Sequence, residues 1–371
     1  MDGLVFGWRT AVFSMAIAQL LAIAIALTRP IANRTANRTL AALLVVLAGI
    51  VTPWAIGFAG FYDRWQWLTF APFAITLAVG PLLWLYGHAL IEGSWPRRGW
   101  RHLVPAMAQL LFLTAGFLLP LPLKSDWASV ALPPYGIVTN LGTVIGLVLY
   151  GAAGLRLLAR YRVRLAEQRS DDGRFASRWL SRSIGATLVL VPVWAGYALY
   201  DAIQPLGYLR LMGLHLAIAG FALYLAIEGW RHAALPFPRL AEAPAEPEPV
   251  PLRDWRALGE QWAEQTRAAG WASDPELTLA RLARHLGTNS SYLSRALNEG
   301  LGLGFSAFVN QLRSATVAEA LKAGDRRDLL ELAFDAGFAS KASFNRAFRA
   351  EYGMSPSAYR RASEAESSPD A

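Results

Sequence analysis

Two stretches in the C-terminal third of the sequence carry side chains of the types that contact nucleic acid bases, in most cases by hydrogen bonds to the base edges. The first set is Ser290, Ser291, Ser294 and Arg295, and the second is Lys341, Ala342, Asn345, Arg346 and Arg349. Arginine can form two hydrogen bonds with guanine and asparagine can form two with adenine, which is direct reading of base sequence. Lys341 and Arg349 suit phosphate oxygens equally well, and phosphate contacts position a protein without reading sequence. For each residue taken singly, the alternative is a solvated surface charge.

Each set lies on a predicted helix that follows a short apolar helix and a glycine turn. In the first stretch the turn is at Gly287 and Asn289 can cap the second helix. The same order returns later, with a helix over 329–336, a turn at Gly337 and a second helix over 340–352. An apolar helix, a tight turn and a second helix with a polar leading face is the geometry that places the second helix in the DNA major groove. The sequence therefore predicts two helix-turn-helix motifs in tandem.

The residues of these motifs also carry a family resemblance. The second stretch contains Gly337-Phe338, Phe344-Asn345-Arg346-Ala347-Phe348 and Gly353-Met354-Ser355-Pro356-Ser357-Ala358-Tyr359-Arg360, and the first contains Tyr292-Leu293-Ser294-Arg295, Gly302, Phe305 and Arg313. With these residues, 277–361 resembles the DNA-binding domain of the AraC/XylS class of bacterial transcription regulators. The resemblance implies two recognition helices in successive major grooves, about one helical turn apart. It does not cover the preceding residues, which look like the membrane-embedded branch of the class.

Long apolar runs precede residue 228 in a chain of 371 residues that is 54% hydrophobic. A helix that crosses a hydrocarbon core of about 30 Å needs roughly 20 apolar residues. Seven segments approach that length: Phe6 to Leu27, Leu40 to Gly60, Trp67 to Leu90, Leu103 to Leu119, Gly136 to Ala159, Ile184 to Ala202 and Gly207 to Ile227. We therefore predict an all-α fold, in which a seven-helix transmembrane bundle is followed by a cytoplasmic tandem helix-turn-helix domain.

The distribution of arginine predicts the orientation of the bundle. Arginines cluster in the loops after the first, third and fifth segments, and the loop over 160–182 is the richest. Positively charged loops remain in the cytoplasm, so the N-terminus is expected outside and the C-terminus inside a bacterial inner membrane. A cleaved signal peptide is the alternative for the first segment, but its removal would place these loops outside.

Composition divides the remainder of the chain. Residues 1–232 form the predicted sensor bundle, 233–251 a Pro/Ala/Glu-rich linker, 252–276 an amphipathic connecting helix, 277–361 the helix-turn-helix domain and 362–371 a disordered acidic tail. The connecting helix is interpreted either as a dimerising or signal-transmitting helix or as a helix that packs on its own domain. The basic excess lies in the bundle and in 277–361, where it agrees with DNA binding.

Ionisable residues inside or at the ends of predicted spans are candidates for sensing a ligand. His88, Glu92 and His215 are the residues singled out, and His215 lies in the last span before the linker. The alternative for His215 is a histidine that is hydrogen-bonded between helices.

Residue types also limit the chemistry. The chain has no cysteine, its five histidines lack metal-ligand spacing, and no Gly-Lys-Ser/Thr phosphate loop or Gly-x-Ser-x-Gly elbow is present. We expect no enzyme activity, cofactor or metal, and a one-component transcription factor regulated through its membrane domain. The expected partners are double-stranded DNA, the lipid bilayer, an unidentified small-molecule effector, RNA polymerase and a second copy of the chain. A transporter or channel, or a membrane enzyme, that carries a regulatory DNA-binding domain remains the alternative.

Overall fold

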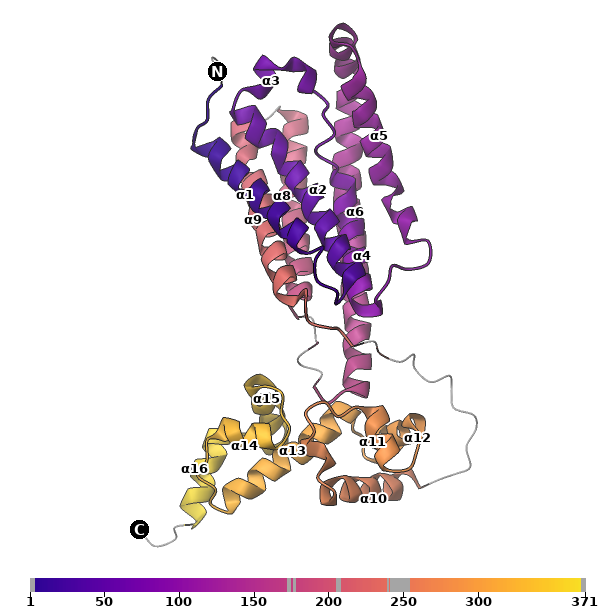
Figure 1. Cartoon of the computed structure of the whole chain (residues 1–371), viewed down its shortest axis with the longest axis vertical. Helices are drawn as coiled ribbons and strands as arrows, with labels where there is room; N and C mark the ends of the chain where they lie inside the picture. The colour runs from indigo at the N-terminus through magenta and orange to yellow at the C-terminus, as the bar shows by residue number, and fades with distance from the viewer. Residues whose placement is uncertain are drawn as a thin grey trace. The chain divides into compact units, whose positions relative to one another are not determined.

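The chain is helical in all the elements that the structure describes. The computed structural model describes residues 4–171, 175, 178–204, 208–238, 240 and 254–367, and the one β-bridge in these residues is the isolated pair Arg169 and Thr278. The chain divides into two compact units (Figure 1). The first contains Met1–Leu158 and Arg178–Arg239, and the second contains Ala159–Ser177 and Leu240–Ala371.

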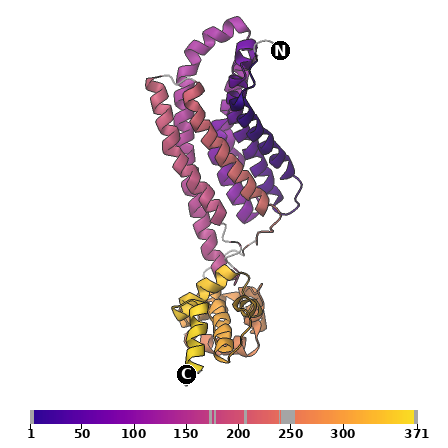
Figure 2. The same ribbon diagram turned by 90° about the vertical axis from the view of Figure 1, so that its left-hand side faces the viewer.

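The first unit is built from long apolar helices. Its helices are α1 (Trp8–Ala26), α2 (Arg34–Phe58), α3 (Phe61–Arg64), α4 (Val79–Glu92), α5 (Val104–Leu118), α6 (Leu121–Gln168), α8 (Arg178–Ile203) and α9 (Tyr208–His232). The unit boundary falls within α6, after Leu158. Two perpendicular views show the long helices running side by side along the unit (Figures 1 and 2).

Helix α2 lies at the centre of this packing. It packs against α1, α4 and α9, and its Leu40, Leu44 and Val51 are completely buried. The other long helices expose more of their apolar surface, as at Leu111 on α5 and Val138 on α6. A helix that is apolar on every side suits a hydrocarbon surrounding better than water. In the described residues, six helices are long and apolar enough to cross a membrane: α1, α2, α5 with its preceding turn, α6, α8 and α9.

The third predicted span, Trp67 to Leu90, is wrong as a continuous helix. Only α4 is α-helical in this segment, and its 14 residues extend for about 21 Å, less than a hydrocarbon core. Before α4 the chain forms short 3-10 turns at Gln66–Leu68 and Thr76–Ala78, and Phe70 adopts a left-handed backbone conformation with φ of 69°. Pro72 comes two residues after Phe70, and proline disfavours helical geometry in the residue before it, here Ala71.

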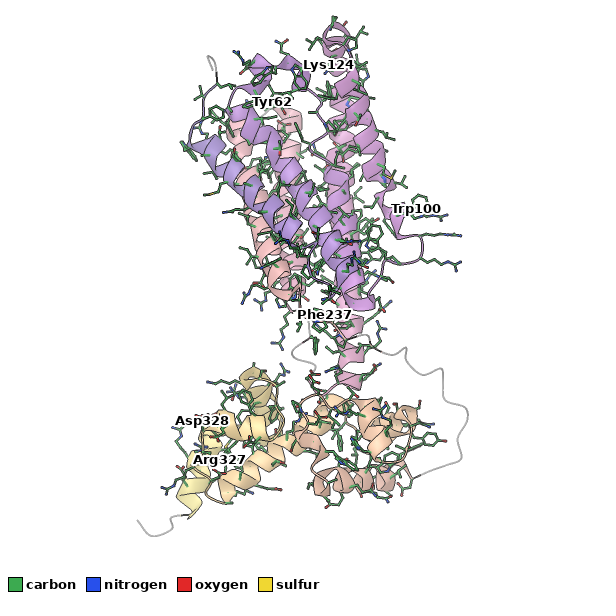
Figure 3. The ribbon with its side chains drawn as sticks, viewed as in Figure 1. Tyr62, Trp100, Lys124, Phe237, Arg327 and Asp328 are labelled. Atoms are coloured by element: carbon green, nitrogen blue, oxygen red, sulfur yellow. The ribbon has the colours of Figure 1, made fainter. Side chains whose placement is uncertain are left out.

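Two buried polar side chains satisfy the backbone that this break exposes. Gln109 of α5 accepts a hydrogen bond from the Leu77 N–H (3.0 Å) and donates to the Ala74 carbonyl (3.3 Å). Lys124, near the start of α6 (Figure 3), donates to the carbonyls of Trp67 and Phe117 at 3.0 and 2.9 Å. Irregular backbone inside an apolar bundle requires such partners. Gln109, a polar residue within the predicted span from Leu103 to Leu119, thus has a structural role.

The break also requires a glycine on α2. A Cβ placed on Gly49 would clash with the backbone carbonyl of Phe73. The irregular segment therefore approaches the α2 backbone more closely than any side chain would allow.

The start of the predicted linker is held on the first unit. Asn37 donates to the Ala233 carbonyl (3.1 Å), and Asn33 donates to the Leu235 carbonyl (2.6 Å) and accepts from the Phe237 N–H (3.4 Å). Residues 233–238 are thus fixed, whereas 239 and 241–253 lie outside the described residues.

The second unit consists of shorter helices. These are α10 (Trp255–Ala268), α11 (Leu279–His285), α12 (Ser290–Arg295), α13 (Phe305–Lys322), α14 (Leu329–Asp335), α15 (Lys341–Tyr352) and α16 (Pro356–Ser367). The helices expected over 329–336 and 340–352 agree with α14 and α15 within one residue at each end. Asn289 caps α12 through the Tyr292 N–H (2.8 Å), as the sequence predicted.

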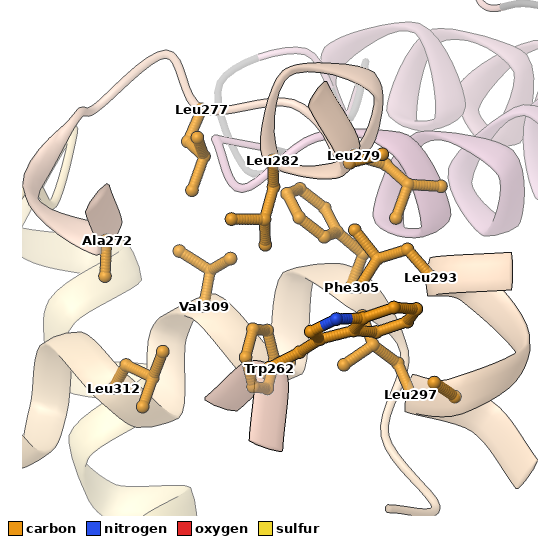
Figure 4. Close-up of a cluster of buried hydrophobic side chains, with 13 residues drawn as sticks. Trp262, Ala272, Leu277, Leu279, Leu282, Leu293, Leu297, Phe305, Val309 and Leu312 are labelled. Atoms are coloured by element: carbon orange, nitrogen blue, oxygen red, sulfur yellow. The ribbon is translucent and has the colours of Figure 1, made fainter. Parts of the chain in front are cut away.

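Two apolar cores stabilise this unit, and α13 contributes to both. The first core joins α10, α11, α12 and the start of α13, with Trp262 of α10 among Leu279, Leu282, Leu293, Leu297 and Phe305 (Figure 4). The second joins the end of α13 to α14, α15 and α16 around Phe338, Phe344 and Phe348. The amphipathic segment therefore packs on its own domain, and its α-helix ends at Ala268 rather than 276.

The predicted disordered tail begins too early. Helix α16 continues to Ser367, so residues 362–367 are helical, and 368–371 lie outside the described residues.

Candidate nucleic-acid interface

Helix α15 separates its apolar and polar faces cleanly. Phe344 and Phe348 are buried in the second core, which fixes the rotation of the helix. Ser340 caps its N-terminus by accepting from the Ser343 N–H (3.2 Å). The five residues predicted to contact DNA from this helix are all exposed, namely Lys341, Ala342, Asn345, Arg346 and Arg349. The structure therefore brings this part of the predicted set together on one solvent-facing surface.

Helix α14 is set in place at its N-terminal end by charged groups. Asp328 caps it by accepting from the Leu330 N–H (2.6 Å). Arg327 (Figure 3) pairs with Asp325 (2.8 Å) and with Asp335 (2.7 Å). The hydrogen bonds from the Arg327 guanidinium lower the pKa of Asp325. The turn between α14 and α15 is then fixed by Gly337, whose φ is +95° and whose Cβ position faces the carbonyls of Ala272 and Ser273. Glycine is required there both for its conformation and for the close approach.

Helix α12 presents a shorter and less exposed surface. Ser290, Ser291, Ser294 and Arg295 are half-buried, and Leu293 on the opposite side is buried in the first core. The predicted residues share one side of the helix, but less of each reaches solvent than on α15.

Arg295 is engaged by neighbours in the protein. Its Nε and Nη2 donate to the two carboxylate oxygens of Glu299 at 2.8 and 3.2 Å, and its guanidinium lies 4.7 Å from the ring centroid of Trp255 on α10. The hydrogen bonds to Glu299 raise the pKa of Arg295. A guanine contact by Arg295 therefore requires exchange of this bidentate partner, and sequence reasoning missed both Glu299 and Trp255 as its neighbours.

Arg346 has a different environment. It makes none of the ion pairs found among the described residues, and it lines a surface hollow of about 500 Å³. The hollow is bordered by Ser306 and Asn310 of α13, by Glu351 of α15 and by Ala166 of α6. Residues near the end of α6 thus lie beside a predicted base-contacting side chain within the second unit.

The residues that follow α6 are bonded to the start of α11. The post-α6 segment, Arg169–Asp171, is held by Ser170, whose N–H and Oγ both donate to the Leu277 carbonyl at 3.2 and 2.9 Å. Arg169 pairs with Asp171 through two hydrogen bonds of 2.6 and 2.9 Å. Ser170 and Asp171 are buried. Sequence analysis placed these residues in a cytoplasmic loop and gave no signal of this contact.

Arg313 is the buried centre of that contact. It is 1% exposed, and it donates from Nε to the Ala272 carbonyl (2.7 Å) and from Nη2 to the Asp274 carbonyl (2.6 Å) and Ser170 Oγ (3.1 Å). Burial lowers the pKa of Arg313 to about 10, so it remains charged at neutral pH. The sequence identified Arg313 as a motif residue without giving its role, which here is to tie α13 to the post-α6 segment.

The three sensing candidates are not brought together. His88 is half-buried on α4 and bonds through Nδ1 to the Ser94 carbonyl (2.9 Å), and Glu92 is exposed at the end of α4. His215 is buried on α9, and its Nδ1 lies 3.0 Å from the Leu211 carbonyl. It lines a cavity of the first unit whose lining includes neither His88 nor Glu92.

Comparison with known proteins agrees with the geometry of the second unit. Residues 282–362 match the family described as "Helix-turn-helix domain". Similar curated proteins include uncharacterized HTH-type transcriptional regulators of Staphylococcus aureus, which are 34% identical over 85 residues. This region is 23% of the present chain, and the chain spans only 11% of the length of these relatives. Residues 282–362 form a helix-turn-helix domain of the AraC type.

A solved structure is also similar. The C-terminal domain of AraT, a response regulator from Geobacillus stearothermophilus, is 27% identical, with a TM-score of 0.25, and the match covers 30% of this chain and 88% of that one. The family match includes α12 through α15 but begins after Ala272, Asp274 and Ser170, three of the residues that contact Arg313. The contact with the post-α6 segment therefore extends beyond the residues that match the family.

Proposed function

We propose that this protein is a membrane-held, one-component transcription regulator. Its second unit binds DNA sequence-specifically through both helix pairs, α11/α12 and α14/α15, and its first unit responds to a signal in or across the membrane. The AraC-type domain and its regulator relatives support DNA binding, and the six long apolar helices support residence in a bilayer.

The proposed topology has seven crossings, with the N-terminus outside and the C-terminus in the cytoplasm. The irregular segment and α4 together make the third crossing, because Gln109 and Lys124 satisfy the non-helical backbone there. The arginine clusters at Arg29–Arg38, Arg97–Arg101 and Arg156–Arg169 then face the cytoplasm. This orientation places the DNA-binding unit where chromosomal DNA is.

One observation carries the regulatory part of the proposal. Helix α6 begins in the apolar unit and continues into the DNA-binding unit, where the post-α6 segment bonds to Leu277 and Arg313. A displacement of α6 in the membrane is therefore transmitted to Leu277, just before α11, and to the buried guanidinium of Arg313 on α13. No phosphorelay is required, because the sensor and the DNA reader share one chain.

In the proposed complex, α15 supplies the dominant base contacts. Arg346 and Asn345 are exposed and face solvent, so they reach base edges without first losing a protein partner. Lys341 and Arg349 hold phosphates, and α12 adds Ser290, Ser291 and Ser294. Two copies of the chain on adjacent sites, in contact with RNA polymerase, complete the proposed regulatory assembly.

A genome-wide map of DNA crosslinked to the full-length protein tests this function. The wild-type protein is compared with an Arg295→Ala/Arg346→Ala variant. The matched control is Arg256→Ala/Arg267→Ala, which removes the same charge from exposed positions of α10 in the same unit. Equal amounts of each protein in the membrane fraction are verified first.

The expected result is a small number of sharp sites that the control keeps and the recognition variant loses. Sites that persist in the recognition variant would remove these arginines from the reading set. A flat map for the wild-type protein in every growth condition would contradict sequence-specific regulation itself.

A further inference from the structure

An open groove of about 710 Å³ lies along α8 and the first turn of α9 in the first unit. Its described lining residues are Pro192, Val193, Gly196, Tyr197, Tyr200 and Arg210. The volume falls within the range of about 300–1,000 Å³ that is typical of ligand sites. All of these residues except Tyr197 are exposed, so the groove opens on the surface of the helix bundle and not into its core.

Two glycines make room for the groove and for the tyrosine in its wall. A Cβ placed on Gly196 of α8 would meet no atom within 4 Å, so the space in front of this residue is open. A Cβ on Gly213 of α9 would lie only 3.2 Å from the Tyr197 hydroxyl, so this side chain reaches from α8 onto the α9 backbone. A molecule in the groove thus contacts a side chain that bridges α8 and α9.

The groove has an apolar part and a charged end. The lining residues from Pro192 to Tyr200 extend for about 12 Å along α8, which ends at Ile203. Arg210 lies in the first turn of α9, which begins at Tyr208. In the proposed orientation these two helix ends face outside. The apolar part then lies in the hydrocarbon of the outer leaflet, and Arg210 lies where that leaflet meets water.

Arg210 differs from the other cations that the proposed orientation places toward the outside. Arg9 and Arg64 lie over aromatic rings, and Lys124 donates to backbone carbonyls. Arg210 makes no ion pair, hydrogen bond or cation–π contact with the residues that the structure describes. The first turn of a helix is also where the helix dipole disfavours a cation. Asp201, the nearest acidic residue in the sequence, lines the neighbouring internal cavity and not the groove.

We propose that this groove binds one anionic phospholipid of the outer leaflet. Its phosphate accepts hydrogen bonds from the Arg210 guanidinium, whose planar donors match phosphate oxygens. One acyl chain lies against Pro192, Val193 and Gly196. An anion beside the first turn of α9 also offsets the unfavourable position of the arginine in the helix dipole. A zwitterionic lipid binds less tightly, because its own ammonium group already neutralises its phosphate.

This inference deepens the proposed function, because it names an outer-leaflet lipid as the chemical class of the signal, and it rests on the proposed membrane residence and orientation. Helix α9 connects Arg210 to Ala233, whose carbonyl accepts from Asn37 at the start of the segment that leads to the DNA-binding unit. The test of lipid binding uses no DNA, so the two proposals fail separately.

The test is photo-crosslinking of the full-length protein in phosphatidylcholine nanodiscs. The probe is a trace of phosphatidylglycerol with a diazirine midway along one acyl chain, and phosphatidylcholine with the same chain is the matched zwitterionic probe. Mass spectrometry measures the label on α8 peptides that contain residues 192–200. This label is normalised to that on α5, whose Leu110 and Leu111 are exposed apolar side chains outside the groove.

Two variants with matched controls locate the binding. Arg210→Gln removes the charge from the groove, and Arg64→Gln removes the same charge from an exposed position of α3. Gly196→Leu fills the groove, and Gly220→Leu adds the same side chain at an exposed position of α9 outside the lining. Neither glycine has an atom within 4 Å of its Cβ position, so both substitutions are expected to leave the fold intact.

In the wild-type protein, phosphatidylglycerol is expected to label these peptides about fivefold more than phosphatidylcholine does. Arg210→Gln should remove this preference and Gly196→Leu should lower the phosphatidylglycerol label to that of the zwitterionic probe, while both controls keep wild-type labelling. Equal labelling by the two probes in the wild-type protein, which requires no variant, would overturn the proposal, as would a preference that Arg210→Gln retains.

Suppression of the label by added oleate but not by unlabelled phosphatidylglycerol would assign the groove to a free fatty acid and would also overturn the proposal. Operator occupancy of the same protein, measured by crosslinking to DNA, shows separately whether the proposed regulatory function stands.

Discussion

Ser170→Ala tests the contact that the post-α6 segment makes with Leu277 and Arg313 within the second unit. The substitution removes the Oγ that donates to the Leu277 carbonyl (2.9 Å) and accepts from Arg313 Nη2 (3.1 Å). A buried neutral hydrogen bond contributes about 1 kcal/mol, and one to a charged group contributes about 1.5–3 kcal/mol. Arg313 keeps its bonds to the carbonyls of Ala272 and Asp274, which limits the loss. We expect the free energy required to release the post-α6 segment from Leu277 and Arg313 to fall by about 2 kcal/mol. The released state should then be populated roughly 30-fold more often.

Hydrogen exchange of the full-length protein in nanodiscs measures this directly, because the Ser170 N–H is itself bonded to the Leu277 carbonyl (3.2 Å) and the variant retains that amide. Peptides that contain residue 170 should exchange roughly 30-fold faster in Ser170→Ala. The control is Thr316→Ala on α13, which removes a side-chain bond to the Leu312 carbonyl within one helix and should leave these peptides unchanged. Unaltered protection in Ser170→Ala would refute the account of the contact. Unaltered operator occupancy together with faster exchange would refute its regulatory role.

Three further outcomes are expected. Arg346→Ala should weaken binding to DNA recovered from the crosslinking map by about tenfold or more in fluorescence anisotropy, with an unchanged melting temperature, because the side chain is exposed. Glu299→Gln should strengthen binding by about threefold, since it removes the bidentate partner of Arg295, and it should have no effect if Arg295 does not touch DNA. Gln109→Leu should lower the free energy of unfolding of the first unit by about 2 kcal/mol, because it leaves the Leu77 N–H and the Ala74 carbonyl unpaired. Thermal unfolding of the protein in detergent measures this change, and Gln19→Leu on the exposed side of α1 is the control that should not show it.

The C-terminal helices could be predicted from the sequence because their signals are local. Glycines at 287 and 337, the cap at Asn289 and the phenylalanines of α15 each act within a few residues, and the structure follows them. The environment of Arg295 could not be predicted in the same way. Its cation–π partner, Trp255, lies on a helix that precedes it by forty residues and meets it only through the first core. Propensity and periodicity contain no such information.

The long apolar segments of the first unit show the opposite limit of sequence-based prediction. Six of the seven spans predicted from hydropathy correspond to long apolar helices, because length and apolar content decide those. Hydropathy does not detect the backbone break in the third span, because the side chains that satisfy it lie elsewhere in the sequence. The partners of the break over 67–78 are Gln109 and Lys124, which come from α5 and α6. Likewise, no residue in Arg169–Asp171 indicated its contact with Leu277, because the two segments are separated by more than a hundred residues.

The size of the post-α6 contact sets a bound on the regulation that it can carry. A signal changes DNA affinity only by the free energy with which it distinguishes the docked from the undocked arrangement. If the two Ser170 Oγ bonds contribute about 2 kcal/mol, these bonds alone can alter DNA affinity by at most roughly 30-fold. A larger induction ratio in the cell would require a further contact. The hollow lined by both Ala166 and Arg346 is where the end of α6 comes close to a side chain that is predicted to contact bases. Enlarging Ala166 to leucine should then weaken DNA binding without changing exchange at Ser170, which separates obstruction of α15 from release of the contact at Arg313.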